Sequence, residues 1–258
     1  MEHQKIIDHI VQWLKTYSEK SSIDGFVVGV SGGIDSAVTS TLCALTGKKV
    51  MAVSMPILQP KDQLSRSYEH TKWLNAQFSN VSNMEIDLTK LFEASIESYP
   101  NEIQDELTMA NVRARLRMTT LYAIAGHNGF LVAGTGNKVE DFGVGFYTKY
   151  GDGGVDLSPI ADLMKSEVFQ LGAHLNIVES ILNAKPTDGL WGDDRTDEDQ
   201  LGATYAELEW AMDHVESNSV DSLSEREKEV LGIYQKLHRA NQHKMIPIPV
   251  CEIPSEYK

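Results

Sequence analysis

The residues best suited to chemistry lie in the segment SGGIDS, at positions 31–36. The apolar run 26–30 comes directly before it and predicts a buried strand, and a helix is expected to begin near Asp35 and Ser36. A glycine turn between a strand and a helix places unpaired N–H groups and the positive end of the helix dipole in one small space. The segment therefore predicts an anion site that suits a phosphate group.

One member of this segment, Asp35, carries a carboxylate that would repel a bare phosphate. The segment also lacks the Gly-Lys-Ser/Thr ending of a Walker A loop, so it is not a P-loop of that type. A divalent cation between the carboxylate and the phosphate removes the conflict. We therefore expect a metal ion beside the phosphate site.

Other polar residues follow later in the chain. The glycine-rich stretch 136–159 contains Lys149, Asp152 and Asp156, and we interpret it as an irregular loop that wraps closely around a ligand rather than as a decorated surface loop. Arg113, Arg115 and Arg117 lie beside the apolar stripe of a long helical pattern. They form either a solvated face or a row from which one arginine points into a site, and the pattern leaves both interpretations open.

The elements that must position these residues alternate along the chain. Apolar runs predict strands at 26–30, 49–55 and 130–134, and a short alternating segment predicts another at 84–87. Helical periodicity predicts helices at 61–79, from an N-cap at Thr89 to Pro100, and at 102–127, 161–174, 197–215 and 224–241. The alternation indicates an α/β fold, a doubly wound parallel sheet with helices on both faces, in a single domain of residues 1–258. Ligands in such sheets bind at the carboxyl ends of the strands, so the chain after residues 30, 55 and 134 is expected to form one crevice.

Two further expectations concern packing. The apolar stripe of the 102–127 helix, from Ile103 and Leu107 to Ala125, is expected to face the core, although part of it could serve an interface. Prolines near the C-terminus predict an extended tail from about residue 243.

Composition excludes several classes of protein. The chain has 258 residues, with 23 Lys+Arg against 37 Asp+Glu and a net charge of −14, which argues against a nucleic-acid-binding protein. Cys43 and Cys251 form no CxxC pair, and each is expected to act as a small apolar filler. No apolar run reaches membrane-spanning length, and the amphipathic N-terminal segment does not resemble a signal peptide. We expect a cytoplasmic protein without a membrane partner.

The segment SGGIDS resembles the SGGxDS signature of the N-type ATP pyrophosphatases, and the rest of the chain is similar to one branch of them, the NAD synthetases. The similarity is carried, in order, by NVRARLRM at 111–118, GTGNKVE at 134–140, FYTKYGDGGVDL at 146–157, Pro159-Ile160, Lys165, KPT at 185–187 and TDE at 196–198. It covers nearly the whole chain and is closest to the short, ammonia-dependent form. The resemblance implies a ligase that amidates deamido-NAD with ATP and ammonia through an acyl-adenylate, releasing AMP and pyrophosphate, as the last step of NAD biosynthesis.

The resemblance also implies roles for individual residues. Asp35 and Glu140 correspond to ligands of Mg²⁺, and no side chain acts as a nucleophile, with Lys165 stabilising charge. The positions that match ATP contacts are Gly29, Val30, Ser31, Gly32, Gly33, Ile34, Asp35, Ser36, Thr135, Lys165 and Thr187. The positions that match deamido-NAD contacts are Arg115, Lys149, Asp156, His243 and Lys244. The chain departs from many relatives at Val139 and at Asp188, and Asp188 adds a charge next to Thr187.

The family works as a homodimer with the dinucleotide near the subunit interface, and the same assembly is expected here. Glutamine-dependent relatives carry an additional amidase domain, so we expect this chain to use free ammonia and to ignore glutamine. Two alternatives stay open. One is another amidating or thiolating member of the superfamily, which an assay on deamido-NAD against xanthylate distinguishes. The other is a nucleotide sensor without turnover, against which the retention of Asp35 and Glu140 argues.

Overall fold

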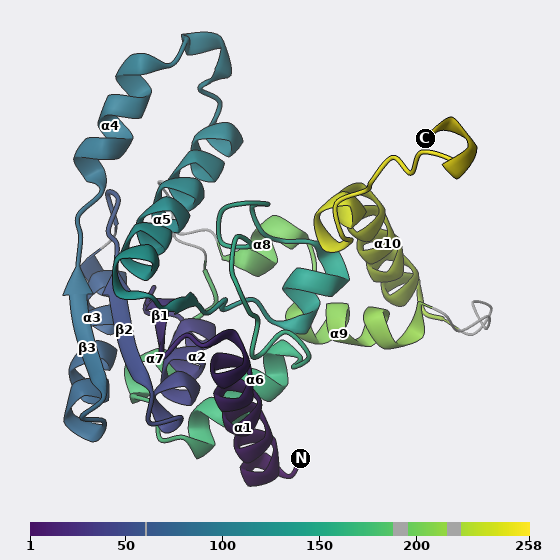
Figure 1. Ribbon diagram of the computed structural model, residues 1–258. Coiled ribbons are helices and arrows are strands. Elements are labelled where there is room, and N and C mark those ends of the chain that lie inside the picture. Colours follow the sequence, from purple (N-terminus) through teal and green to yellow (C-terminus); the bar gives the residue numbers. More distant parts are fainter. Residues whose placement is uncertain (60, 188–195, 216–222) are drawn as a thin grey trace.

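A four-stranded parallel sheet forms the centre of the computed structural model, which describes residues 1–59, 61–187, 196–215 and 223–258 (Figure 1). Its strand order is β3-β2-β1-β4. The strands are β1 (Gly25–Gly29), β2 (Lys49–Ser54), β3 (Val81–Glu85) and β4 (Leu131–Val132). A strand is present near each expected position, but β3 spans Val81–Glu85 instead of 84–87. β4 is shorter than expected because Ala133 makes only an isolated bridge to Leu157 before the chain leaves the sheet.

Helices connect and flank the strands. In chain order they are α1 (His3–Ser21), α2 (Ile34–Leu45), α3 (Lys61–Gln77), α4 (Thr89–Ser98), α5 (Glu106–Asn128), α6 (Lys165–His174), α7 (Glu179–Leu182), α8 (Asp197–Leu201), α9 (Tyr205–His214) and α10 (Glu225–Met245). Three short turns of other helix types lie between or after them: η1 (Asn101–Ile103), the π-helix η2 (Val139–Val144) and η4 (Ser255–Tyr257). None of the helices in the described ranges is long and apolar enough to span a bilayer.

Alternate residues of β1 enter different cores. Phe26 and Val28 pack with α1, α2 and α6, whereas Val27 packs with α4 and α5. Successive side chains of a strand point to opposite faces, so these two cores cover the two faces of the sheet. The prediction of a doubly wound parallel sheet with helices on both faces is confirmed.

A third hydrophobic cluster lies away from the sheet, where η2 packs against α8, α9 and α10 (Figure 1). Val139, Leu208, Val230 and Tyr234 are buried in it. These helices bring the C-terminal third of the chain next to the loop after β4. The assignment of residues 1–258 to one domain stays a prediction.

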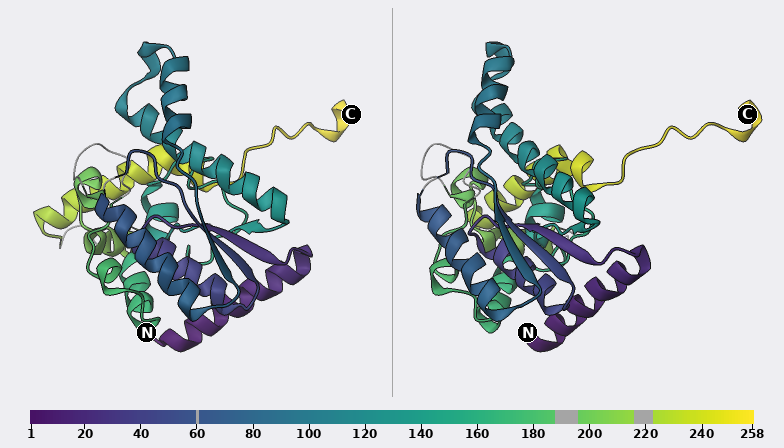
Figure 2. Two further views of the ribbon diagram at one scale, coloured as in Figure 1. Left: turned by 90° about the vertical axis from the view of Figure 1, so that its left-hand side faces the viewer. Right: turned by 60° about the vertical axis from the view of Figure 1, so that its left-hand side comes forward.

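The prediction that the whole stripe of the 102–127 helix faces the core is wrong at its first turns. α5 begins at Glu106, where Asp105 caps it by accepting a hydrogen bond from the Thr108 N–H at 3.0 Å. Ile103 is 46% exposed and Leu107 61% exposed. The physical reason is that α4 and the start of α5 form a hairpin that projects beyond the sheet, as Figure 2 shows, so these turns have no sheet to pack on.

Three local expectations are also corrected. Thr89 is the first residue of α4 and not its N-cap, because the Asp87 carboxylate already accepts the Thr89 N–H at 2.8 Å. The stretch 136–159 is not wholly irregular, since η2 winds from Val139 to Val144 before Gly145 ends it with φ 65°. The expected 197–215 helix is two helices, because Gly202 adopts φ 76° and terminates α8.

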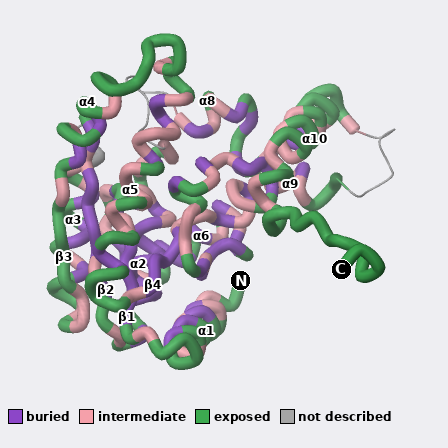
Figure 3. The backbone as a smooth tube through the Cα atoms, turned by 45° about the horizontal axis from the view of Figure 1, so that its top comes forward, coloured by how far each residue is buried: buried purple, intermediate pink, exposed green. Residues whose placement is uncertain are grey.

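The C-terminal boundary differs as well. α10 continues to Met245, so His243 and Lys244 lie in its last helical turn and the extended tail begins at Ile246 instead of residue 243. The tail runs away from the body and is exposed throughout (Figures 2 and 3). Cys43 is buried as expected, but Cys251 lies on this tail and is exposed, so it fills no core.

Candidate functional site

The turn between β1 and α2 has the geometry of an anion cradle. Gly32 adopts φ 86°, a conformation that favours glycine, and Gly33 leads into α2 without a side-chain cap. The Ser36 hydroxyl accepts the Ser31 N–H at 3.2 Å and donates to the Gly33 carbonyl at 3.0 Å, which holds the turn closed. The first N–H groups of α2 and its dipole therefore face the space above the turn, and this end of the helix favours an anion.

One cleft contains every residue that the sequence assigned to ATP or to the metal. The cleft lies at the carboxyl ends of β1, β2 and β4, as expected for a parallel sheet. The ATP and metal positions that line it are Gly29, Val30, Ser31, Gly32, Gly33, Ile34, Asp35, Ser36, Thr135, Glu140, Lys165 and Thr187. Residues from distant parts of the chain thus meet at the predicted crevice.

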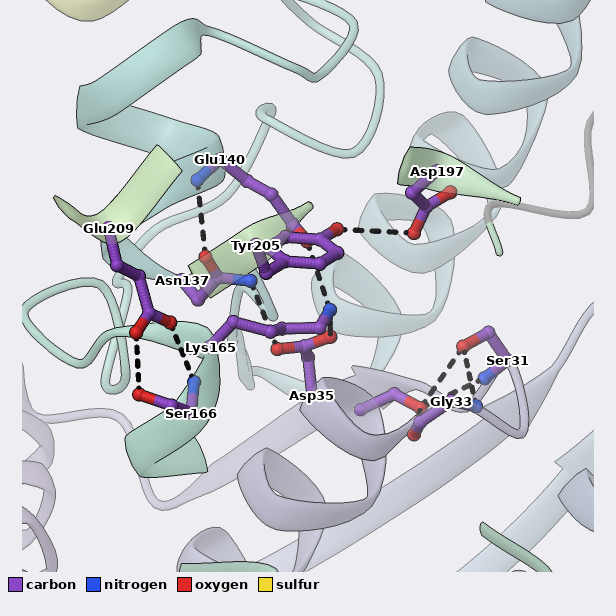
Figure 4. A network of polar contacts seen from close by, with 11 residues as sticks. Ser31, Gly33, Asp35, Asn137, Glu140, Lys165, Ser166, Asp197, Tyr205 and Glu209 are labelled. Atoms are coloured by element: carbon purple, nitrogen blue, oxygen red, sulfur yellow. Dashed lines mark hydrogen bonds and ion pairs between the residues drawn. The ribbon is translucent and has the colours of Figure 1, made fainter. Parts of the chain in front are cut away.

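At the centre of the cleft, one ammonium group lies between two carboxylates (Figure 4). Lys165 Nζ is 2.6 Å from Asp35 Oδ2 and 3.0 Å from Glu140 Oε1. The Lys165 side chain is only 5% exposed, and the two carboxylates are 16% and 15% exposed. Lys165 is the first residue of α6, so the packing of α6 against α2 brings the ammonium to the phosphate turn.

Electrostatics in this group are strongly coupled. Burial raises the pKa of Asp35, and the neighbouring Glu140 raises it further, while Lys165 opposes both. Burial alone would lower the pKa of Lys165, but the Asp35 and Glu140 carboxylates outweigh it and raise the pKa above its ordinary value. Lys165 is therefore a permanent cation. Asp141, the residue after Glu140, also has a raised pKa. Burial, and then the charges of Glu140, Asp152 and Asp35, raise it to about 8.

The carboxylate pair fits a magnesium ion. Asp35 and Glu140 direct oxygens at a common cation, the ammonium of Lys165. Mg²⁺ prefers oxygen ligands and usually takes one or two carboxylates, with water and substrate phosphates completing its shell. Within residues 1–59, 61–187, 196–215 and 223–258, no group of three or more His, Cys, Asp or Glu side chains could hold a metal. Two carboxylates suit a cation whose remaining ligands are water and substrate phosphates.

Sequence reasoning missed two groups that hold the pair in place. Asn137 is fully buried, donates from Nδ2 to Asp35 Oδ1 at 3.2 Å and accepts the Glu140 N–H at 3.1 Å. Tyr205, from α9, donates its hydroxyl proton to Glu140. Asn137 carried a signal, since it follows a buried strand at the ligand-binding edge. Tyr205 carried none, because only the tertiary fold brings α9 to the cleft.

The arginine row has one member in the cleft. Arg117 lines it and donates from Nε to the Met55 carbonyl at 3.0 Å and from Nη2 to Gln59 Oε1 at 2.8 Å. Arg113 instead lies over the Phe92 ring, 4.5 Å from its centroid, where α5 packs against α4. Of the two interpretations left open, the structure favours the one in which a single arginine reaches a site, since Arg117 holds the chain after β2 at the cleft wall.

The residues assigned to deamido-NAD do not line this cleft. Four of them form a separate group around the loop after η2: Arg115 Nη2 donates to the Lys149 carbonyl at 3.4 Å, and Lys149 Nζ donates to the His243 carbonyl at 2.5 Å. Lys244 Nζ donates to the carbonyls of Gly145 and Tyr147 at 2.9 and 2.7 Å. The end of α10 therefore ties down the 145–149 loop.

Asp156 lies apart from those four. Its carboxylate accepts the Tyr122 hydroxyl at 3.0 Å and the Val132 N–H at 2.8 Å, which fixes it beside β4. Of the two departures from relatives, Val139 is buried in the cluster of α8, α9 and α10. Asp188 lies outside the described residues.

Comparisons with known proteins identify the family of this chain. The family model described as NAD synthase matches residues 6–247. An NH(3)-dependent NAD(+) synthetase from Methanosarcina acetivorans is 35% identical over 98% of this chain and 100% of its own length. The structure of an NMN synthetase from Francisella tularensis superimposes with a TM-score of 0.84 at 31% identity, covering 99% of both chains. An NH3-dependent NAD synthetase from Campylobacter jejuni, solved with a nitrate ion, superimposes with a TM-score of 0.79 at 26% identity, covering 98% of this chain and 100% of that one. A strand-turn-helix phosphate cradle, a buried acidic pair around a lysine and a full-length family match thus lead to one conclusion: this chain belongs to the NAD synthase family.

Proposed function

We propose that this protein is a ligase that converts deamido-NAD to NAD with ATP and ammonia, through an acyl-adenylate. The observation that carries the proposal is the Lys165 ammonium held between Asp35 and Glu140 beside the phosphate turn, within one cleft. The family match supports the choice of reaction within the superfamily.

The chemistry begins with a poor acyl donor. A nicotinate carboxylate has no usable leaving group, so its oxygen attacks the α-phosphorus of ATP, the bond to the β-phosphate oxygen breaks, and pyrophosphate departs. Ammonia then adds to the acyl carbon of the adenylate, AMP leaves, and the nitrogen loses a proton to give the amide. This reaction needs no protein nucleophile, and none is proposed.

The residues of the cleft bind the triphosphate and balance its charge. The N–H groups at the start of α2 face the leaving pyrophosphate, and Lys165 supplies a positive charge where negative charge develops. Asp35 and Glu140 would hold Mg²⁺, which when bound neutralises charge on the triphosphate. Thr135, which follows β4, and Thr187 line the same cleft, which supports their assignment as nucleotide contacts.

The test of the metal assignment is Asp35→Ala, with Asp162→Ala as the matched control. Asp162 is 97% exposed and pairs with Lys138 at 3.0 Å, away from the cleft lining. We expect Asp35→Ala to abolish turnover and to leave a cooperative thermal transition, while Asp162→Ala retains both. Near-normal turnover of Asp35→Ala would refute the assignment.

The nitrogen source is tested separately. Amidation by the purified chain should rise with ammonium concentration and should not respond to equimolar glutamine, as the names of the NH(3)-dependent relatives suggest. Efficient use of glutamine would refute this part of the proposal.

A second candidate substrate is nicotinate mononucleotide, favoured by the similarity to an enzyme named NMN synthetase. Both substrates present the same nicotinate carboxylate, so the adenylation site serves either. Comparison of kcat/KM for deamido-NAD and nicotinate mononucleotide, measured as pyrophosphate release dependent on each substrate, decides between them. A higher value for the mononucleotide would replace the first candidate.

The oligomer we propose is a homodimer that forms through the exposed hairpin of α4, η1 and the start of α5. Its apolar side chains that face solvent are Leu91, Ile96, Tyr99, Ile103 and Leu107. Figure 3 shows the exposed stretches of this hairpin at one end of the molecule. Apolar side chains gathered on a projecting element are typical of an interface.

Light scattering after size-exclusion chromatography tests this assembly. Leu107→Glu should give a monomer, whereas Ile248→Glu, at an equally exposed position on the C-terminal tail, should leave the dimer intact. Dissociation by Ile248→Glu alone would place the interface on the tail instead of the hairpin.

A further inference from the structure

Tyr205 is the one tyrosine hydroxyl that the structure places against the acidic pair within the described residues. It is the first residue of α9, next to the capping box in which Thr204 and Glu207 exchange hydrogen bonds. Its side chain is 6% exposed. The hydroxyl lies 2.5 Å from Glu140 Oε1 and 3.2 Å from Asp197 Oδ2. Figure 4 shows Tyr205 between these two acids, with its contact to Asp197 dashed.

The hydroxyl can act only as a donor toward Glu140. It has one proton, and the shorter contact, to Glu140, receives it. The Glu140 oxygen that accepts it, Oε1, is also the oxygen that pairs with Lys165.

The ring of the same tyrosine contacts Lys165. Lys165 Nζ lies 4.7 Å from the Tyr205 ring centroid, within the range of a cation–π interaction. Tyr205 therefore contacts Glu140 through its hydroxyl and the Lys165 ammonium through the face of its ring. Asn137 holds Asp35 and the backbone of Glu140 from the other side, so Tyr205 supplies the contact to the Glu140 carboxylate that Asn137 does not.

α8 connects the Tyr205 hydroxyl to the segment that carries Thr187, a residue assigned to ATP binding. Asp197, the second neighbour of the Tyr205 hydroxyl, is 5% exposed and begins α8. Its N–H donates to the Pro186 carbonyl at 3.2 Å, directly before Thr187. Tyr205 and Asp197 thus join the carboxylate pair to the segment that carries Thr187.

We infer that Tyr205 is a positioning residue for the ATP-dependent step, because its hydroxyl orients the Glu140 carboxylate toward the cation of the nucleotide complex. This inference rests on the proposed role of Glu140 as a metal ligand. Hydrogen bonds from a second residue to a metal-binding carboxylate typically change metal affinity or activity about 10–100-fold. Tyr205→Phe keeps the ring over Lys165 and removes only the proton donor, so it isolates this contribution.

The experiment measures how strongly Mg²⁺ supports nucleotide binding. The dissociation constant of α,β-methylene-ATP, which the enzyme cannot cleave between these phosphates, is measured by calorimetry with saturating Mg²⁺ and with EDTA. The metal contribution is the constant in EDTA divided by the constant with Mg²⁺, so a larger ratio means that Mg²⁺ strengthens nucleotide binding more. Tyr234→Phe is the matched control, since Tyr234 is 3% exposed in the same hydrophobic cluster and, among the residues that the structure describes, makes no hydrogen bond to Glu140.

We expect Tyr205→Phe to reduce this ratio about 10–100-fold and to leave the constant in EDTA unchanged, while Tyr234→Phe changes neither. A thermal transition of Tyr205→Phe close to that of Tyr234→Phe shows that the fold is retained. An unchanged ratio in Tyr205→Phe, together with a lost ratio in Glu140→Gln, would overturn the inference alone. An unchanged ratio in Glu140→Gln would overturn the metal assignment and the inference with it.

Should Tyr205→Phe fail to fold, Tyr205→Met is the second variant, because a flexible apolar side chain can fill the same buried space without a proton donor. We expect the same fall of about 10–100-fold in the metal contribution. A folded Tyr205→Met that keeps the wild-type metal contribution would overturn the inference.

Discussion

Replacement of Lys165 by methionine is the perturbation that most directly tests the charge balance of the site. Methionine keeps the length and much of the apolar stem but removes the ammonium that lies 2.6 and 3.0 Å from two carboxylates. Asp35 and Glu140 would then face each other in the cleft without a cation. Removal of one partner of a buried ion pair destabilises a protein by about 3–5 kcal/mol.

The lower end of that range applies here. Both carboxylates retain some contact with water, at 16% and 15% exposure. We therefore expect the free energy of unfolding to fall by about 3 kcal/mol. A chain of this size has a urea m-value near the upper end of the usual range, about 3 kcal/mol per M. The urea midpoint of Lys165→Met should therefore fall by about 1 M. Turnover should fall about 10²–10³-fold, as on removal of one group that stabilises transition-state charge.

The matched control is Lys138→Met. Lys138 also forms an ion pair, with Asp162 at 3.0 Å, but its side chain is 35% exposed and the partner 97% exposed. Exposed pairs contribute at most about 1 kcal/mol, so this midpoint should change little. The reasoning is refuted if the two variants shift the midpoint equally, or if Lys165→Met turns over at the wild-type rate.

The pH dependence of stability independently tests whether lost charge balance is what destabilises Lys165→Met. Burial already raises the folded-state pKa of Asp35 above 3.8, and loss of Lys165 raises it further. A carboxyl group with a raised folded pKa binds its proton more readily in the folded state, so acid favours folding of the variant. The loss of stability in Lys165→Met should therefore shrink as the pH falls through the raised pKa toward 3.8. A loss that is constant with pH would point to packing instead of charge.

Two further outcomes are expected. His70 is fully buried and its pKa is lowered to about 4 by burial, so the protein should lose stability as the pH falls from 6.5 toward 4, by up to about 3 kcal/mol. His70→Gln should remove this acid sensitivity in urea titrations at several pH values, and the same effect from exposed His127→Gln would contradict it. Ser224 caps α10 in a reciprocal box with Glu227, and Ser224→Ala should lower the free energy of unfolding by about 1 kcal/mol. Ser95→Ala, at a half-buried position in the middle of α4, should change this free energy little, and equal losses would argue against the cap.

Much of the fold was predictable because its signals are local. Apolar runs of strand length marked β1, β2 and β4, whereas the alternating segment at 84–87 marked only the end of β3. The alternation of strands with helices indicated parallel pairing with helices on both faces. The errors came where a boundary depends on its surroundings. Thr89 was predicted as an N-cap, but the Asp87 carboxylate accepts its N–H and Thr89 is the first helical residue. Leu107 fits the apolar stripe of α5, but it lies on the hairpin beyond the sheet and is exposed. Helical periodicity reports which face is apolar, and only the packing reports what covers that face.

For the site, the sequence by itself determined the phosphate turn, because a strand, two glycines and a helix start within about ten residues form it without distant contacts. It also indicated that Asp35 needs a cation nearby. Only the tertiary structure shows which cation of the chain lies beside Asp35. Lys165 lies 130 positions after Asp35, and α6 must pack on α2 before the ammonium reaches the carboxylate. Tyr205 reaches Glu140 only after α9 has packed against η2. A hydrogen bond of 2.5 Å depends on where elements meet in space, and no spacing along the chain encodes that distance.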